Sequence, residues 1–283
     1  KELYTTLSAQ QKSKIVLPWN DGVGKGGGVA TRLGMYNRPL RNERIADNYT
    51  PAQQELLQQT LKAICADDEG FRRISRDGTW DNSKSFDGCG AHIFGDPTGD
   101  GQFAWLFTGH HLTVRCDGNS EPGAAFGGPM YYGHLAHGYA GRNVFRFQTR
   151  AVENVFEALN EKQREQATIT GSPGEHRKSV TFRDRGQPHP GIAYGDLSAG
   201  QKKVVEDAMR IILSPFRKED GDEAMAILKA NGGIDKLHIA FYKDPDGDQF
   251  DKWHFWRLEG PGFVWNFRVL PHVHCYVNIG KIA

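Results

Sequence analysis

The sequence has little cysteine, and the few cysteines it has are widely spaced. Its 283 residues include only Cys65, Cys89, Cys116 and Cys275, and none of them forms a C-x-x-C pair. This spacing argues against a zinc-ribbon or thioredoxin-type site. The four residues could form up to two disulfides in an oxidising compartment or remain buried thiols in the cytosol, and the sequence leaves both alternatives open.

An excess of charge of either sign is also missing, because Lys and Arg total 35 while Asp and Glu total 34. Proteins that bind nucleic acid usually carry a basic surplus, so the composition argues against such a partner. No run approaches the roughly 18 consecutive apolar residues of a membrane-spanning helix. We therefore expect a small molecule, a saccharide or a peptide as the substrate, and the oligomeric state stays open.

Three common catalytic motifs are missing as well. The sequence contains neither a G-x-S-x-G elbow nor an H-E-x-x-H helix. The Gly-rich stretch at residues 21–28 lacks the Lys followed by Ser or Thr that a Walker loop requires, so it is predicted to be a loop without a phosphate-binding role. Any site must therefore be built from residues that are distant in the sequence.

What the sequence does contain predicts an α+β fold. Apolar residues at helical spacing predict helices at residues 50–66, 150–167, 198–213 and 222–230. Aromatic and β-branched runs predict strands at residues 91–96, 103–116, 236–243, 253–259, 263–270 and 272–278. We expect a single domain over residues 1–283, with a mostly antiparallel sheet flanked by helices. Residues 1–50 would form an N-terminal arm with the Gly-rich loop, and residues 168–196 a surface excursion.

Two aromatic blocks carry the histidines that bear on function. Residues 103–115 contain His110 and His111, and residues 253–278 contain His254, His272 and His274. Side chains two residues apart on a strand point to the same face, so His272 and His274 can reach one metal ion. Only one of His110 and His111 can face inward if their strand is regular, and periodicity does not choose between them.

These histidines predict a metal site. Imidazole suits copper, zinc, iron or nickel, whereas a site without Asp or Glu nearby argues against magnesium and calcium. A lone histidine in an aromatic strand is more often a hydrogen-bonded core residue, so it is the pairing of the residues that favours metal. The candidate ligands are His110, His111, His272 and His274. The aromatic residues around them would exclude water and tune the metal: Trp105, Trp253, Trp256 and Trp265.

The same blocks resemble a known family. The phrases W-L-F-T-G-H-H-L at residues 105–112, H-F-W-R-L-E-G-P-G-F-V at 254–264 and P-H-V-H at 271–274 resemble the bacterial family catalogued as domain of unknown function 3500. The likeness covers most of the chain and implies that its five block histidines are recurrent polar residues. Members often look exported, which agrees with a chain that begins at Lys1 without Met, so a periplasmic or extracellular location is expected.

The sequence departs from the family's pattern at two positions. Arg115 stands where the family usually has Asn, and Asn266 stands where it usually has Glu. If that Glu is a ligand or base in relatives, its role is lost or changed in this chain. The resemblance supplies no established reaction.

Taken together, the residues favour a copper-dependent oxidoreductase of unknown substrate. Copper is preferred to zinc because the predicted ligands are all nitrogen and the protein is expected to be exported. Arg115 and Asn266 would anchor the substrate or a bound oxygen species, and His254 is a further catalytic candidate. The alternatives are a zinc-dependent hydrolase with Glu259 or an Asp of the loops as general base, a metal carrier that is no enzyme, or a ligand-binding module.

Overall fold

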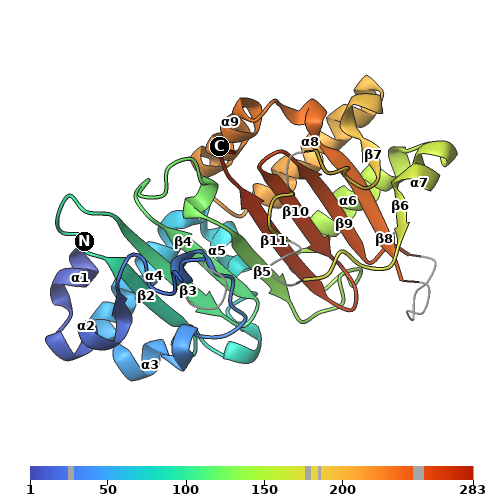
Figure 1. The fold of residues 1–283 in the computed structure, drawn as a ribbon. Helices are drawn as coiled ribbons and strands as arrows, with labels where there is room; N and C mark the ends of the chain where they lie inside the picture. The colour runs from blue at the N-terminus through green and yellow to red at the C-terminus, as the bar shows by residue number, and fades with distance from the viewer. Residues whose placement is uncertain (25–28, 176–179, 184–185, 245–251, 283) are drawn as a thin grey trace. The chain divides into compact units, whose positions relative to one another are not determined.

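The computed structural model describes residues 1–24, 29–175, 180–183, 186–244 and 252–282. The chain divides into two compact units (Figure 1). The first comprises Lys1–Tyr132 and Pro215–Arg217, and the second comprises Gly133–Ser214 and Lys218–Ala283. Residues 25–28 of the expected Gly-rich loop lie outside the described residues.

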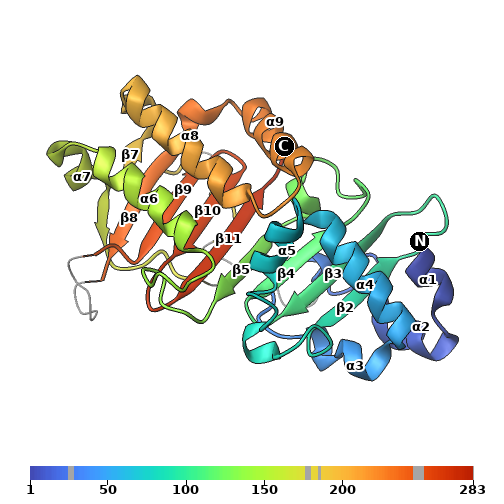
Figure 2. The same ribbon diagram turned by 180° about the vertical axis from the view of Figure 1, so that it is seen from behind.

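The first unit is built on strands in the order β1-β2-β3-β4-β5. Its helices are α1 (Glu2–Thr6), α2 (Ala9–Ile15), α3 (Ile45–Asn48), α4 (Pro51–Ile64) and α5 (Asp68–Ile74). Its strands are β1 (Val16–Leu17), β2 (Gly90–Gly95), β3 (Phe103–Gly109), β4 (Leu112–Cys116) and β5 (Met130–His134), of which the last two residues belong to the second unit. Figure 2 shows α4 and α5 across one face of these strands.

The second unit is built on strands in the order β11-β10-β9-β8-β6, with β7 pairing on β8. Its helices are α6 (Arg146–Ala158), α7 (Glu161–Ala167), α8 (Ala199–Leu213) and α9 (Lys218–Ala230). Its strands are β6 (Thr168–Thr170), β7 (Ile192–Ala193), β8 (His238–Lys243), β9 (Phe255–Gly260), β10 (Phe263–Arg268) and β11 (Val273–Ile279).

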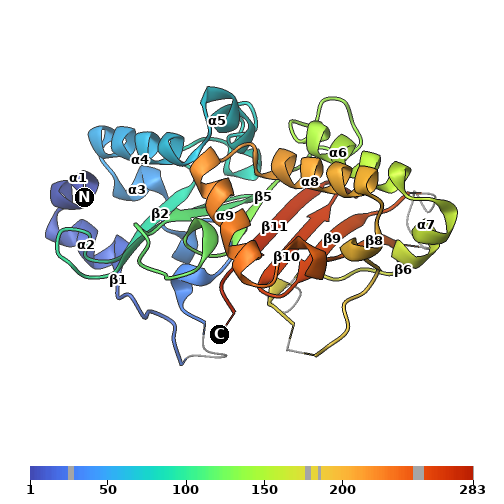
Figure 3. The ribbon, with the colours of Figure 1, turned by 90° about the horizontal axis from the view of Figure 1, so that it is seen from above.

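The two faces of the second unit's strands are covered differently. Helices α6 and α8 lie side by side across one face (Figures 2 and 3). Polar contacts place part of the excursion after β6 on β9, β10 and β11. Asn266 donates to the Gly174 carbonyl at 3.3 Å, Asn278 donates to the Val180 carbonyl at 2.8 Å, and Arg183 binds Glu259 at 2.8 Å. The described parts of residues 168–196 therefore bind polar side chains of three neighbouring strands: Asn266, Asn278 and Glu259.

The α+β class is confirmed, but the expectation of a mostly antiparallel sheet was wrong because the pairing is mixed. Strand β1 pairs with β2 in parallel, and β6 pairs with β8 in parallel. A parallel pair requires a long crossover, and helices α3 to α5 lie between β1 and β2 in the sequence, while α8 and α9 lie between β6 and β8. At two and three residues, β1 and β6 are too short for an alternating pattern to reveal them.

The predicted helices form where capping residues favour them. Thr50 and Ser198 each complete a capping box with a Gln three residues later, at α4 and α8. The helix expected at residues 150–167 is instead two, because Asn160 caps a new helix, α7, after α6 has ended. Helix α9 begins about one turn earlier than predicted, at Lys218. None of the helices in the described ranges has the length and apolarity needed to cross a bilayer.

A three-residue segment from late in the chain completes the first unit. Residues 215–217 lie between α8 and α9 in sequence, yet the Pro215 carbonyl accepts a hydrogen bond from Ala66 at 3.0 Å. The Phe216 ring packs edge-on against Phe126 and tilted against Tyr132, with ring centroids 5.7 and 5.8 Å apart. The first unit therefore depends on residues that follow most of the second.

Three of the four cysteines are buried: Cys65, Cys89 and Cys275. Burial raises the pKa of Cys65 to about 12 and that of Cys89 to about 11. Neither side chain takes part in a disulfide in the part of the chain that the structure describes.

Candidate functional site

The second unit brings His272 and His274 into direct contact at the start of β11. Their Nε2 atoms lie 3.0 Å apart, and their ring centroids are 4.7 Å apart. His274 is only 8% exposed, while His272 is half-buried. Two imidazole nitrogens that each bind a zinc-sized ion at about 2.0–2.1 Å lie roughly 3 Å apart. The spacing of the pair therefore suits two ligands of one ion, and it also suits a nitrogen–nitrogen hydrogen bond.

Arg268 and Glu175 hold these two rings in place. Arg268 on β10 is the register partner of His274, and its Nη2 atom lies 3.0 Å from His272 Nε2. Glu175, from the excursion after β6, places Oε1 2.8 Å from His274 Nδ1. The second carboxylate oxygen of Glu175 forms an ion pair with Arg268. The four side chains form one connected polar cluster.

These partners determine which nitrogens carry protons. A guanidinium only donates, so the lone pair of His272 Nε2 accepts from Arg268. A carboxylate only accepts, so His274 Nδ1 must carry a proton toward Glu175. A neutral His274 then also presents a lone pair at Nε2. His272 Nε2 has only one lone pair, which Arg268 and the His274 Nε2 atom both approach at 3.0 Å. The two rings can share an ion if Arg268 releases His272, or a second proton on His274 lets its Nε2 donate to His272.

In the first unit, His110 and His111 form the turn between β3 and β4. Gly109 and Leu112 are register partners, so residues 103–116 form a hairpin, and the expected single strand was wrong. His111 has φ 54°, the left-handed conformation that lets so short a turn close. As a result, the two rings do not alternate as they would on a strand. They lie against each other with centroids 3.8 Å apart.

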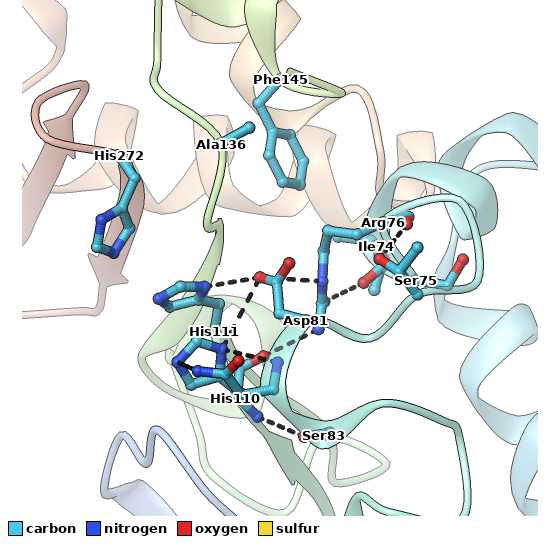
Figure 4. A network of polar contacts seen from close by, with 12 residues as sticks. Ile74, Ser75, Arg76, Asp81, Ser83, His110, His111, Ala136, Phe145 and His272 are labelled. Carbon is cyan, nitrogen blue, oxygen red and sulfur yellow. Dashed lines mark hydrogen bonds and ion pairs between the residues drawn. The ribbon is translucent and has the colours of Figure 1, made fainter. Parts of the chain in front are cut away.

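Asp81 is the centre of the network around this turn (Figure 4). Its Oδ2 atom lies 2.7 Å from His111 Nδ1, 4.0 Å from His110 Nδ1 and 3.7 Å from Arg76 Nε. The side chains of Asp81 and Arg76 are 2% and 0% exposed, so the pair is desolvated. One ligand atom from each of Asp81, His110 and His111 lies within 4.8 Å of the others, which makes this trio a second possible cation site.

The environment of His110 favours its neutral form. Burial, followed by the neighbouring His111, lowers its pKa to about 4, although Asp81 acts in the opposite direction. The Asn82 backbone N–H lies 3.3 Å from His110 Nδ1, and the Ser83 hydroxyl accepts from the His110 backbone N–H at 2.8 Å. A neutral imidazole retains the lone pair that a metal or a proton donor would use.

The three predicted catalytic residues fall in different surroundings. Arg115 on β4 is 4% exposed, and its guanidinium donates to the carbonyls of Pro129 and, at 2.7 Å, Gly34. Burial lowers its pKa to about 9. Asn266 on β10 is fully buried between its register partners Arg257 and Tyr276. His254 precedes β9, where its backbone N–H donates to the Tyr242 carbonyl at 2.7 Å.

Asn266 also has an unused acceptor. Its Nδ2 donates to Gly174, but its buried Oδ1 has no hydrogen-bond partner among the described residues. Glu259, the candidate base of the hydrolase alternative, is 1% exposed and is bound by both Arg257 and Arg183. Burial acts to raise its pKa, but the hydrogen bond and charge of Arg257, with Arg183, lower it overall. A carboxylate held in this way is a weak base.

Sequence reasoning missed the residues that hold the histidines. Glu175 and Asp81 lie in polar segments without periodicity, and each contacts a histidine that is far away in the chain. Arg268 did carry a signal, because it is the one charged residue in the strand F-V-W-N-F-R. A charge on an otherwise apolar, buried strand usually has a partner.

The comparisons with known proteins bear on the family alone. No curated protein and no solved structure matches the chain. The family described as "Protein of unknown function (DUF3500)" matches residues 1–277, which confirms the resemblance carried by the histidine blocks. The chain is therefore a member of the DUF3500 family.

Proposed function

We propose that this protein binds a transition-metal ion through His272 and His274. The observation that carries the proposal is the 3.0 Å approach of the two Nε2 atoms, which is the spacing of two imidazole ligands of one ion. Glu175 on the far nitrogen of His274 forms the carboxylate–histidine arrangement that orients imidazole ligands and raises their basicity. A metal ion between the rings would take the Nε2 lone pair of each, with the Arg268 guanidinium displaced from His272 and further ligands from solvent or substrate.

Copper is the ion that we propose. Among divalent first-row ions, copper binds nitrogen sites most tightly, and bound copper would supply one-electron chemistry to an oxidoreductase reaction. The chain's own residues would position the substrate beside the pair. Asn266 offers an unused buried acceptor on the same face of β10 as Arg268, which touches both His272 and Glu175. The zinc hydrolase receives less support, because Glu259 is bound by two guanidinium groups.

Metal analysis tests this proposal. The full chain, purified without an affinity metal, is loaded with copper and analysed by elemental analysis and electron paramagnetic resonance. We expect one copper per chain, with a nitrogen-ligated signal that is lost in His272→Ala/His274→Ala. The matched control is His134→Ala/His137→Ala, which removes two other histidines of the second unit.

The outcomes separate the alternatives. Copper retained in full by the His272→Ala/His274→Ala variant would overturn the site. A protein that takes up no metal at all would show that a proton, rather than an ion, joins the two rings. A copper signal without oxygen uptake in the presence of any tested reductant would favour a metal carrier over an oxidoreductase.

A further inference from the structure

A cleft of about 600 Å³ opens on the first unit beside the His110–His111 turn. Its lining comes from residues 37–44, from α3, from residues 82–88 and from His110. Most of the lining side chains are polar or charged: Asn37, Arg38, Asn42, Arg44, Asp47, Asn82, Ser83, Lys84 and His110. The volume lies within the range of sites that hold small-molecule ligands.

Positive charges outnumber negative charges in the lining of this cleft. Arg38, Arg44 and Lys84 line it, against a single acidic residue, Asp47. The side chains of these three cations form no ion pair or hydrogen bond among the residues that the structure describes. Elsewhere in the unit, cations such as Arg41 and Arg73 are paired with Asp21 and Glu69. The cleft therefore gathers three positive charges whose partner is not supplied by the described protein.

The backbone of the cleft's lining has an uncommon conformation at two positions. Asn42 has φ 60° and Lys84 has φ 68°, both in the left-handed region that non-glycine residues seldom adopt. Such conformations cost of order 1 kcal/mol or more and persist where surrounding contacts enforce them, often at ligand-binding sites. The Ser83 hydroxyl accepts a hydrogen bond from the His110 backbone N–H at 2.8 Å, which links two segments of the cleft's lining.

We propose that this cleft binds a small molecule that carries a phosphate group. The arginine fork matches phosphate oxygens in bidentate geometry, and lysine binds them as a point charge. A doubly charged phosphate is attracted more strongly to three cations than a singly charged carboxylate is. The amides of Asn37, Asn42 and Asn82 provide neutral donors for the remaining oxygens or for the rest of the ligand. This site is independent of the metal proposed at His272 and His274.

The test is calorimetric titration of the full chain with inorganic phosphate and with glycerol 3-phosphate, with acetate as the monoanion. We expect one phosphate site per chain and weaker binding of acetate. Arg44→Gln and Lys84→Gln should each weaken phosphate binding by about tenfold or more, since each removes a charge-assisted hydrogen bond. The matched control is Lys62→Gln, which removes the same charge from the exposed surface of α4, outside the cleft.

Several results would overturn the proposal. These are no phosphate binding, equal loss of binding in Lys62→Gln, or acetate binding as tight as phosphate binding. A titration in the His272→Ala/His274→Ala background should retain the site. Loss of phosphate binding there would place the anion at the histidine pair instead of in the cleft.

Discussion

Glu175 binds the Nδ1 atom of His274 at 2.8 Å while its other carboxylate oxygen is ion-paired with Arg268. A residue of the excursion after β6 thus sets the proton position on a β11 histidine 99 residues later in the chain. This contact gives the metal proposal its sharpest consequence, because loss of a carboxylate behind a metal-binding imidazole usually lowers metal affinity without removing a ligand.

Glu175→Gln should therefore weaken copper binding by about 10- to 100-fold while leaving the copper stoichiometry at saturation unchanged. Competition titration with a chromophoric chelator measures the affinity. Glu165→Gln on α7 is the control, since it removes an exposed acid of the same unit. An unchanged affinity in Glu175→Gln would mean that the carboxylate does not act on a metal ligand.

Replacing one member of the buried pair of Arg257 and Glu259 should destabilise the protein much more than replacing both. Arg257 Nε lies 2.8 Å from Glu259 Oε2, with both side chains under 5% exposed. Glu259→Gln should destabilise the protein by about 3–5 kcal/mol, because it leaves a buried guanidinium without its charge partner. Arg257→Met/Glu259→Leu should recover most of that loss in urea denaturation.

The control for this pair is Glu157→Gln on α6. Glu157 pairs with Arg150 at 3.3 Å, but both side chains are more than half exposed, so the change should cost less than about 1 kcal/mol. A double variant as unstable as Glu259→Gln would show that the polar row on β9 is held by more than this pair.

His92 should make the stability of the protein fall in mild acid. It is fully buried on β2, neither ring nitrogen has a partner among the described residues, and burial, then the charge of Arg41, lowers its pKa to about 4. The unfolded chain binds the proton near pH 6.5, so between pH 6.5 and 4 the unfolded state holds more protons than the folded state. The free energy of unfolding should therefore decrease by up to about 3 kcal/mol as the pH falls through this window.

Urea denaturation at pH 7.5, 6 and 5 measures this effect. His92→Leu removes the titrating group and should flatten that part of the pH dependence, because its neighbours Leu106 and Phe94 offer an apolar environment. An identical pH dependence in both proteins would assign the acid sensitivity to other groups.

Arg115→Met distinguishes a structural role from the substrate-anchoring role that the sequence favoured. The substitution leaves the buried carbonyl of Gly34 and the part-buried carbonyl of Pro129 without their donors, at a cost of about 1–3 kcal/mol for the buried one. We expect a clear loss of stability in thermal and urea unfolding. Unaltered stability with weakened substrate binding would support the anchoring role instead.

The elements with strong local signals could be read from the sequence. Thr50 and Pro51 mark the start of α4, and the His-x-His spacing places His272 and His274 on one side of β11. The turn at His110 and His111 could not be read, because two histidines are not a typical turn sequence and left-handed φ at His111 is enforced by its contacts with Asn37 and Asp81.

The residues that bind the histidines could not be predicted from the sequence, for a different reason. Glu175 and Asp81 have no periodic context, so only the folded chain shows which histidine each one binds. Likewise, β1 and β6 are recognisable only from the strands beside them, since a few residues of extended chain carry too little pattern.

The segment at residues 215–217 has a consequence for how this protein is made. A nascent chain that has emerged through Tyr132 carries β1 to β4 and the first three residues of β5, but it lacks the ring of Phe216 that packs against Phe126 and Tyr132. During synthesis, we therefore expect these aromatic rings to lack their partner until more than 80 further residues have been added. A fragment that ends at residue 132 should be prone to aggregation, and chaperones that bind exposed aromatic surface should associate with the chain during that interval.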